Sequence, residues 1–310
     1  MPMNEDDKKY MTEGGKKAEE KDREQDQRRD GRKFPDPDTR YSEYRVRLKN
    51  LTIMSDIFGR NVLKDLRCTE YILRIILNDK NLKVIDQTLQ ADFKNLHGRG
   101  VVLDCLATDN KRRKVNIEFQ QGKEGAHPKR ARYHLGLIDS NILDSGQNFD
   151  ELPESYVIFI TQRDALGKNL PILHLDRMIR ETGEASGDQT HFIYVDASKQ
   201  DNDTELGRLM HDLNCRDASD MHEGILAERV HYLKETERGV EQMCKEMDEL
   251  CSMAFEDGKV KGKEAGRREE KMKVVKNMNN LKMSIEQIAQ VADVDIKTVR
   301  EWIAEEIVPA

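Results

Sequence analysis

Three polar side chains interrupt two apolar stretches near the middle of the chain, in the segment GRGVVLDCLATDNKRRKVNIEFQ (98–120). Asp104 lies within VVLDCLA, whereas Glu118 and Gln120 lie within KVNIEFQ. Strand interiors disfavour Asp and, to a lesser degree, Glu, so acids at these positions call for an explanation. A hard cation such as Mg²⁺ binds one or two carboxylates together with water and a substrate phosphate. Such a metal lowers the pKa of bound water and stabilises charge on a phosphate in transit.

The spacing of the two acids predicts that a β-hairpin brings them together. In KVNIEFQ, apolar and polar residues alternate, which indicates a strand with Glu118 and Gln120 on one face. The polar segment TDNKRR (108–113) separates it from VVLDCLA (101–107) and predicts the turn. With symmetric pairing about residue 111, Asp104 and Glu118 stand opposite each other, where two carboxylates repel unless a cation joins them or one is protonated. Gln120 could then orient a water molecule or a phosphate oxygen.

Other residues could complete this site. Glu70, in CTEYILRIIL, is an acid among apolar neighbours and could bind a metal directly or through water. Lys129, Arg130 and Arg132 open the next segment and could contact phosphates, which attract basic side chains irrespective of sequence.

Ordinary structural roles explain the same residues and stay open at this point. An E-x-Q pattern on an alternating strand is commonly the solvated face of an antiparallel sheet. Glu70 could be a surface helix position, and the basic residues could form a charged helix face. Asp104 is harder to explain in this way, because its neighbours are apolar on both sides.

The remaining pattern predicts a mixed α/β domain around the hairpin. Helical spacing occurs in VLKDLRCTEYILRIILND (62–79) and in HPKRARYHLGLIDSNILDSG (127–146), where Pro128 suits a first turn. We expect strands at 83–93, 156–161 and 191–196. A strand, a helix and a further strand imply a right-handed parallel crossover.

Composition changes divide the chain into five expected segments. These are a disordered charged arm (1–40), an α/β domain (41–216), a helical segment (217–258), a basic, glycine-punctuated linker (259–279) and a helix-turn-helix-like pair (280–307). In the last segment Ser284 and Gln287 fit a capping box, and Asp295 can cap the second helix.

Charge and cysteine content restrict the class of protein. The 310 residues carry a formal net charge of -7, so nucleic-acid binding would need a local basic surface. The five cysteines include no CxxC pair, which is typical of a reduced cytoplasmic protein. His211, Cys215 and His222 match no standard zinc spacing. No apolar run approaches the roughly 20 residues of a membrane span, and the N-terminus lacks a signal-peptide pattern.

Several of these stretches together resemble the PD-(D/E)XK nuclease family transposases, also called recombination-promoting nucleases. The stretches are NLHGRGVVLDCLATDNKRRKVNIEFQ, KRARYHLGLIDSNIL and DELPESYVIFIT, and the resemblance covers roughly residues 50 to 255. It implies an α/β, restriction-endonuclease-like core, with a mixed sheet flanked by helices, followed by a C-terminal helical region. It also implies cleavage of DNA phosphodiester bonds with Mg²⁺ (or Mn²⁺).

The resemblance assigns expected roles to individual residues. The acid of the long strand falls on Asp104, the acid of the E-x-K element on Glu118, and the acid of the first core helix on Glu70. Asp104 and Glu118 are the implied metal ligands. Gln120 occupies the position of the Lys and carries no charge, although Gln occurs there in this branch of the family.

Two functions follow, of different kinds. The first is a metal-dependent DNA endonuclease acting in recombination. The second is a catalytically degenerate protein that binds DNA or a partner, with Lys297, Thr298 and Arg300 on the second helix of the C-terminal pair. Separately, apolar residues at three-and-four spacing could mediate self-association or could pack on the chain's own core; they are Val240, Met243, Met247, Leu250 and Ala254.

Overall fold

The computed structural model describes residues 36–94 and 98–304. Most of the charged arm expected over 1–40 therefore lies outside the described residues, and its last residues begin helix α2 (Pro37–Asn50). The chain divides into two compact units, Met1–Cys244 and Lys245–Ala310.

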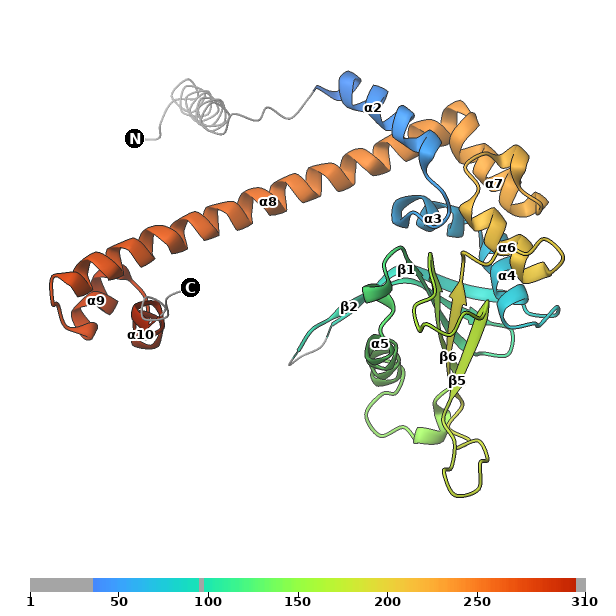
Figure 1. Cartoon of the computed structure of the whole chain (residues 1–310), viewed down its shortest axis with the longest axis horizontal. Coiled ribbons are helices and arrows are strands. Elements are labelled where there is room, and N and C mark those ends of the chain that lie inside the picture. The colour runs from blue at the N-terminus through green and yellow to red at the C-terminus, as the bar shows by residue number, and fades with distance from the viewer. Residues whose placement is uncertain (1–35, 95–97, 305–310) are drawn as a thin grey trace, which may run out of the picture. The chain divides into compact units, whose positions relative to one another are not determined.

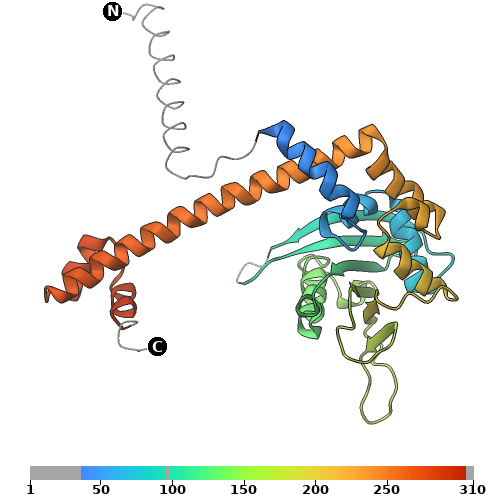
Figure 2. The same ribbon diagram turned by 45° about the horizontal axis from the view of Figure 1, so that its top comes forward.

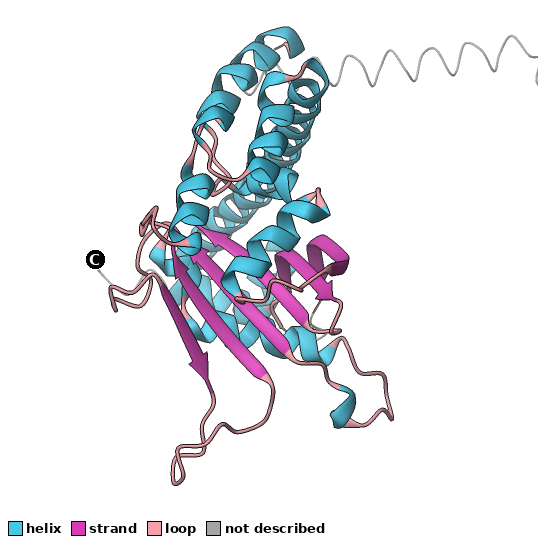
Figure 3. Ribbon diagram, turned by 90° about the vertical axis from the view of Figure 1, so that its right-hand side faces the viewer, coloured by secondary structure: helices cyan, strands magenta, loops and turns pink. Residues whose placement is uncertain are grey.

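The first unit is built on one mixed sheet, as the α/β prediction requires (Figures 1 and 3). Its order is β1-β2-β3-β4-β6-β5. The first three strands are antiparallel neighbours, whereas β3, β4 and β6 run parallel. The strands are β1 (Val84–Phe93), β2 (Val101–Asp109), β3 (Lys114–Gln120), β4 (Ser155–Thr161), β5 (Ile172–Asp176) and β6 (Thr190–Asp196).

Strand β5 was absent from the sequence prediction. It pairs antiparallel with β6 at the edge of the sheet, and none of its five residues is fully buried. An edge strand of this kind buries no complete apolar face, so its hydrophobic pattern is weak. Its position in the fold comes from pairing with β6 and not from its own composition.

Helix α5 (Pro128–Ser140) packs against one face of the sheet (Figure 2). His127 caps it by accepting a hydrogen bond from the Lys129 N–H at 3.1 Å, and Pro128 occupies the first turn as expected. The predicted helix extended to residue 146, but α5 ends at Ser140. Leu135 and Ile138 are buried in a core with Phe159 of β4.

Further helices lie on the opposite side of the sheet (Figure 2). They are α3 (Asp56–Leu63), α4 (Leu66–Ile76), α6 (Glu205–Asn214) and α7 (Gly224–Glu235). The helix expected over 62–79 corresponds to α4, and it begins later because Asp65 caps it by accepting the Arg67 N–H at 3.0 Å. The domain boundary expected after residue 216 does not coincide with the end of the first unit, because α7 packs on α3 and α4.

The basic segment 259–279, expected to be a linker, lies inside one continuous helix, α8 (Glu237–Asn280). Its two glycines, Gly262 and Gly266, are exposed and meet no neighbouring atom, so they cost helix propensity without breaking the helix. Ion pairs between residues four apart, such as Lys261–Asp257 at 2.6 Å and Lys273–Glu269 at 2.8 Å, support this exposed stretch. Earlier in α8, Met243 and Met247 are buried whereas Leu250 and Ala254 are exposed.

The C-terminal pair consists of α9 (Ile285–Ala292) and α10 (Ile296–Ala304), and residues 305–307 of the expected segment lie outside the described residues. The predicted capping box is present, because Ser284 and Gln287 each accept the backbone N–H of the other, at 3.3 and 3.1 Å. Asp295 accepts the Thr298 N–H at 2.8 Å, as predicted. Within the second unit, Trp302 and Val275 of α8 belong to one small core.

Candidate active site

The β2–β3 hairpin has the register that symmetric pairing predicts. Cys105 pairs with Ile117, and Thr108 pairs with Lys114, so the turn is centred on residue 111. Moving away from the turn, Asp104 and Glu118 are the next residues beyond the last pair, Cys105 and Ile117. The two acids therefore meet at the position where regular pairing of these strands stops.

Each of the two carboxylates binds the backbone of the other strand. The Asp104 N–H donates to Glu118 Oε1 at 3.3 Å, and the Phe119 N–H donates to Asp104 Oδ2 at 3.1 Å. On the other side of Asp104, Gln90 of β1 adopts a left-handed conformation with φ of 53°, and its Nε2 lies 3.5 Å from Asp104 Oδ1. Side-chain oxygens thus replace carbonyls as acceptors where the strands separate.

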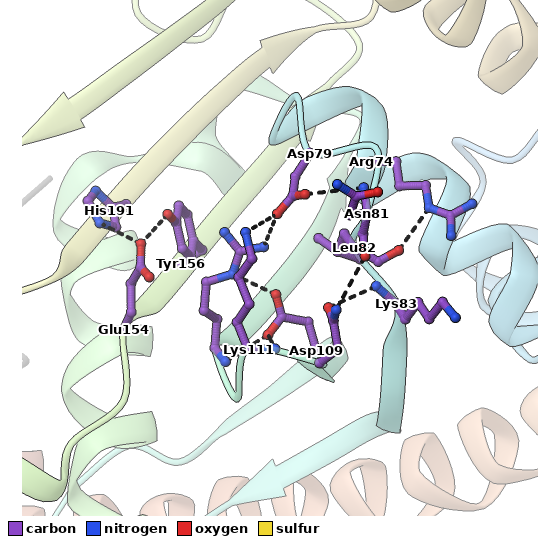
Figure 4. A network of polar contacts seen from close by, with 12 residues as sticks. Arg74, Asp79, Asn81, Leu82, Lys83, Asp109, Lys111, Glu154, Tyr156 and His191 are labelled. Atoms are coloured by element: carbon purple, nitrogen blue, oxygen red, sulfur yellow. Dashed lines mark hydrogen bonds and ion pairs between the residues drawn. The ribbon is translucent and has the colours of Figure 1, made fainter.

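A buried ionic network at the turn fixes this register (Figure 4). Asp109 is wholly buried, and its Oδ1 accepts the backbone N–H groups of Lys111 and Arg113 at 2.9 and 2.8 Å. The Arg113 side chain donates from Nε to Asp109 Oδ2 at 2.5 Å and from Nη2 to Asp79 Oδ2 at 2.9 Å. Because a slip of one residue would reverse the face of every side chain, this network helps to set where Asp104 and Glu118 point.

Glu118 is fully buried and faces helix α5. Asn116 Nδ2 donates to Oε1 at 3.0 Å, and His134 Nδ1 lies 3.6 Å from the same oxygen. The guanidinium of Arg130 lies 3.6 Å from Oε2, which has no hydrogen-bond partner among the described residues. Arg130 Nε also lies 3.2 Å from His134 Nε2 and can only donate, so we assign the His134 proton to Nδ1, which faces Glu118.

Asp104 lines a separate, open pocket of about 380 Å³. Burial, and secondly the nearby charge of Glu118, raise the pKa of Asp104 from 3.8 to about 7. Asp56, at the start of α3, lines the same pocket and adds to this effect. Gln90 and Gln120 also contribute to the lining, so the polar groups in the pocket are carboxylates and amides, which offer the oxygen ligands of a hard cation.

Asp56 is the acid that sequence reasoning missed. It lies in a different helix from the residues expected to complete the site, far from Asp104 along the chain. In the sequence it looks like an acid in the first turn of a helix, which is a common position for structural reasons alone. No spacing rule identifies it.

The structure does not bring Glu70 to this pocket. Glu70 Oε1 lies 2.5 Å from Arg74 Nη2, and Oε2 accepts the Val84 N–H at 3.0 Å. These contacts tie α4 to the first residue of β1. Glu70 therefore has a local structural role in the described part of the chain, in place of the expected one at the pocket.

The position of Gln120 depends on a close approach by Gly125. A Cβ added at Gly125 would lie 1.9 Å from Gln120 Oε1, so any other residue there would require the Gln120 amide to move. The 3₁₀ turn at Lys123–Ala126 thus has a glycine where the amide of Gln120 needs room. Gln120 lines the Asp104 pocket, as the prediction of a shared site requires.

The predicted phosphate-binding residues line a neighbouring cleft of about 700 Å³. Lys129, Arg130 and Arg132 all contribute to it, together with Arg99. Val102 lines both this basic cleft and the Asp104 pocket. A positively charged surface thus adjoins the carboxylates in a chain whose net charge is negative.

The comparisons with known proteins agree with this fold. The sequence model of the PD-(D/E)XK nuclease family transposases matches residues 57–287. The α/β fold, with its mixed sheet flanked by helices, fits a nuclease of this class. The chain belongs to the PD-(D/E)XK nuclease family transposases. Neither the curated proteins nor the solved structures that were searched gave a match. No helix among residues 36–94 and 98–304 is long and apolar enough to cross a membrane.

The raised pKa of Asp104 predicts a pH-dependent stability of the metal-free protein. The protonated Asp104 side chain stabilises the folded protein. This contribution is complete below about pH 3.8 and is lost as the pH rises through about 7, because the folded protein then holds an ionised Asp104 carboxylate beside Glu118. We expect Asp104→Asn to raise the free energy of unfolding at pH 8, by about 2 kcal/mol more than at pH 5. Urea titrations in EDTA at both pH values measure this. The exposed Asp203→Asn serves as the control, and an equal gain at both pH values would contradict the assignment.

Proposed function

We propose that this chain is a metal-dependent DNA endonuclease that uses Mg²⁺ (or Mn²⁺) and acts in recombination. One observation carries the proposal: the half-buried carboxylate of Asp104 and the buried carboxylate of Glu118 meet on adjacent strands, where their charges are incompletely compensated. The adjoining basic cleft supplies a second requirement, a surface for a polyanionic backbone. DNA is the proposed substrate and partner.

The residues present fit a hard divalent cation. Among the described residues none donates a hydrogen bond to the buried Glu118 Oε2, and burial together with the charge of Glu118 raises the pKa of Asp104. A cation at this position would relieve both unfavourable features. We assign Asp104 and Glu118 as ligands; Asp56 also lines the pocket wall, but both of its oxygens pair with Arg60, at 3.1 and 3.2 Å. The ion would supply a water of lowered pKa and a positive charge for the phosphate.

The other residues of the site have roles that do not depend on the metal ion. Gln120 is placed in the pocket, where its amide can accept a hydrogen bond from the attacking water or donate one to a phosphate oxygen. Arg130 provides the charge that Gln120 lacks, because its guanidinium lies between the basic cleft and Glu118. Lys129 and Arg132 hold the DNA backbone in the cleft. In the reaction, the water oxygen bonds to phosphorus as one phosphorus–oxygen ester bond breaks.

His134 is a positioning residue in this scheme. It receives a hydrogen bond from Arg130 on Nε2 and presents its Nδ1 proton toward Glu118. Its ring is almost fully buried, and it lies 5.9 Å from the ring of Phe159 of the central strand β4, measured between centroids, with the two rings tilted at 44°. It therefore keeps the Glu118 carboxylate oriented.

Cleavage of supercoiled plasmid tests the proposal directly. We expect purified protein to nick the plasmid in Mg²⁺ and not in EDTA, and Asp104→Ala to lose nicking while still binding DNA in a gel-shift assay. Binding without cleavage by the unmodified protein in both Mg²⁺ and Mn²⁺ would refute the nuclease and leave the catalytically degenerate binding module as the function.

A further inference from the structure

A second cluster of metal-ligating side chains lies at the end of helix α6, away from the residues of the proposed nuclease site. His211, Asp212 and Cys215 come from the last turn of α6 and its cap, and His222 comes from the loop before α7. Ligand atoms of His211, Asp212 and His222 all lie within 4.8 Å of one another. The sequence spacing matched no standard zinc site, and only the fold brings these residues together.

Asp212 organises the loop that brings His222 to the cluster. Its carboxylate is fully buried, and Oδ1 and Oδ2 accept the backbone N–H groups of His222 and Glu223 at 2.8 and 2.9 Å. This clamp places the His222 ring 4.6 Å from the His211 ring, measured between centroids. The clamp therefore brings two imidazoles together across one loop.

The contacts of His211 leave one ring nitrogen available to a metal. His211 Nδ1 lies 3.2 Å from Asp212 Oδ1, and since a carboxylate can only accept, Nδ1 carries the proton. Nε2 then keeps its lone pair. A carboxylate that holds the far nitrogen of a ligating histidine is the usual arrangement at zinc sites.

Cys215 supplies a sulfur at a suitable separation. Its Sγ lies 3.8 Å from His211 Nε2 and 3.4 Å from Nδ1. A tetrahedral ion with a zinc–sulfur bond of about 2.3 Å and a zinc–nitrogen bond of about 2.0 Å separates these ligands by roughly 3.5 Å. Small side-chain rotations thus suffice to bring Sγ and Nε2 onto one ion.

We propose that His211, Cys215 and His222 bind one Zn²⁺ ion, with water as the fourth ligand and Asp212 orienting His211. Thiolate and imidazole ligands suit zinc, whereas the oxygen donors around Asp104 suit Mg²⁺. The Cys215 thiol proton is released to solvent when the metal binds. The ion ties the end of α6 to the loop before α7, so it fastens α7 to the sheet-bearing core.

Zinc binding by the full chain tests the site. We expect one equivalent of Zn²⁺ in competition with a chromogenic chelator, and Co²⁺ to give a thiolate charge-transfer band in the near ultraviolet. Cys215→Ser should abolish that band, and His222→Asn, at an exposed position, should weaken zinc binding at least about tenfold. Zinc should raise the midpoint of thermal unfolding of the unmodified protein and of neither variant.

Matched variants decide between this site and other binding. Cys251→Ser and His231→Asn remove the same chemical groups from a half-buried and an exposed position on α8 and α7, and should leave zinc binding unchanged. Stoichiometric zinc that survives Cys215→Ser and His222→Asn would overturn the proposal, as would the absence of tight binding. Zinc that is lost in Asp104→Asn but kept in Cys215→Ser would assign the ion to the nuclease pocket instead.

Discussion

Replacement of Glu118 by Gln is expected to reduce the rate of DNA cleavage about a thousandfold, with little change in the affinity for DNA. Glutamine keeps the shape of the side chain and an oxygen that can accept from Asn116 and from the Asp104 N–H. It removes the charge that would hold a cation. Loss of metal-derived stabilisation of several kcal/mol corresponds to this factor, at about 1.4 kcal/mol for each tenfold change.

Glu70→Gln is the matched control, because the sequence alone placed Glu70 in the same site. Glu70 binds Arg74 and the Val84 N–H, so its substitution should leave cleavage by the folded protein within about threefold of normal and cost less than about 1 kcal/mol of stability. Single-turnover cleavage and filter binding on both variants measure the contrast. Equal loss in the two variants would show that Glu70 belongs to the site after all.

Part of this site could be predicted from the sequence. The hairpin could be predicted from a clean alternation in β3 and a polar turn, which fixed its centre at residue 111. The meeting of Asp104 and Glu118 follows from that symmetry. Both are short-range consequences of chain geometry, in which the period of a strand and the length of a turn leave few alternatives.

Long-range features were not predictable in this way. The approach of Asp56 to Asp104 depends on how α3 packs on the sheet, and the orientation of Glu70 depends on how α4 meets β1. Neither has a sequence period. The clustering of His211 with His222 likewise depends on Asp212 folding the intervening loop, which no ligand-spacing pattern encodes.

The expected linker over 259–279 lies inside a helix for a different reason. Glycine and charge favour a linker on composition, but lysines and acids spaced four apart also favour an exposed helix. The two descriptions use the same residues. Local propensity decided the outcome there, whereas packing decided it in the core.

Asp109→Ala is expected to destabilise the first unit by about 3–5 kcal/mol, the range found when one partner of a buried ion pair is removed. Arg113 is 8% exposed and would retain its ion pair with Asp79 and its contact with the Tyr156 ring, but two backbone N–H groups of the turn would lose their acceptor. Urea unfolding followed by far-ultraviolet circular dichroism measures the change. Asp109→Asn keeps an oxygen for the two N–H groups, so its stability should fall between that of the unmodified protein and that of Asp109→Ala.

Asp188→Ala is a control that separates the effect of burial on stability from the effect of hydrogen bonding. Asp188 lies in the connection between β5 and β6, where it accepts the Thr190 N–H at 3.4 Å and pairs with Arg177 at 2.7 Å, but its side chain is 32% exposed. Water can replace those partners, so a loss below about 1 kcal/mol is expected. A similar cost for Asp109→Ala would mean that the buried network does not fix the hairpin.

Since the register of that hairpin aligns Asp104 with Glu118, Asp109→Asn should also lower cleavage by protein that remains folded. Unchanged cleavage would show that the strands hold their register without the turn.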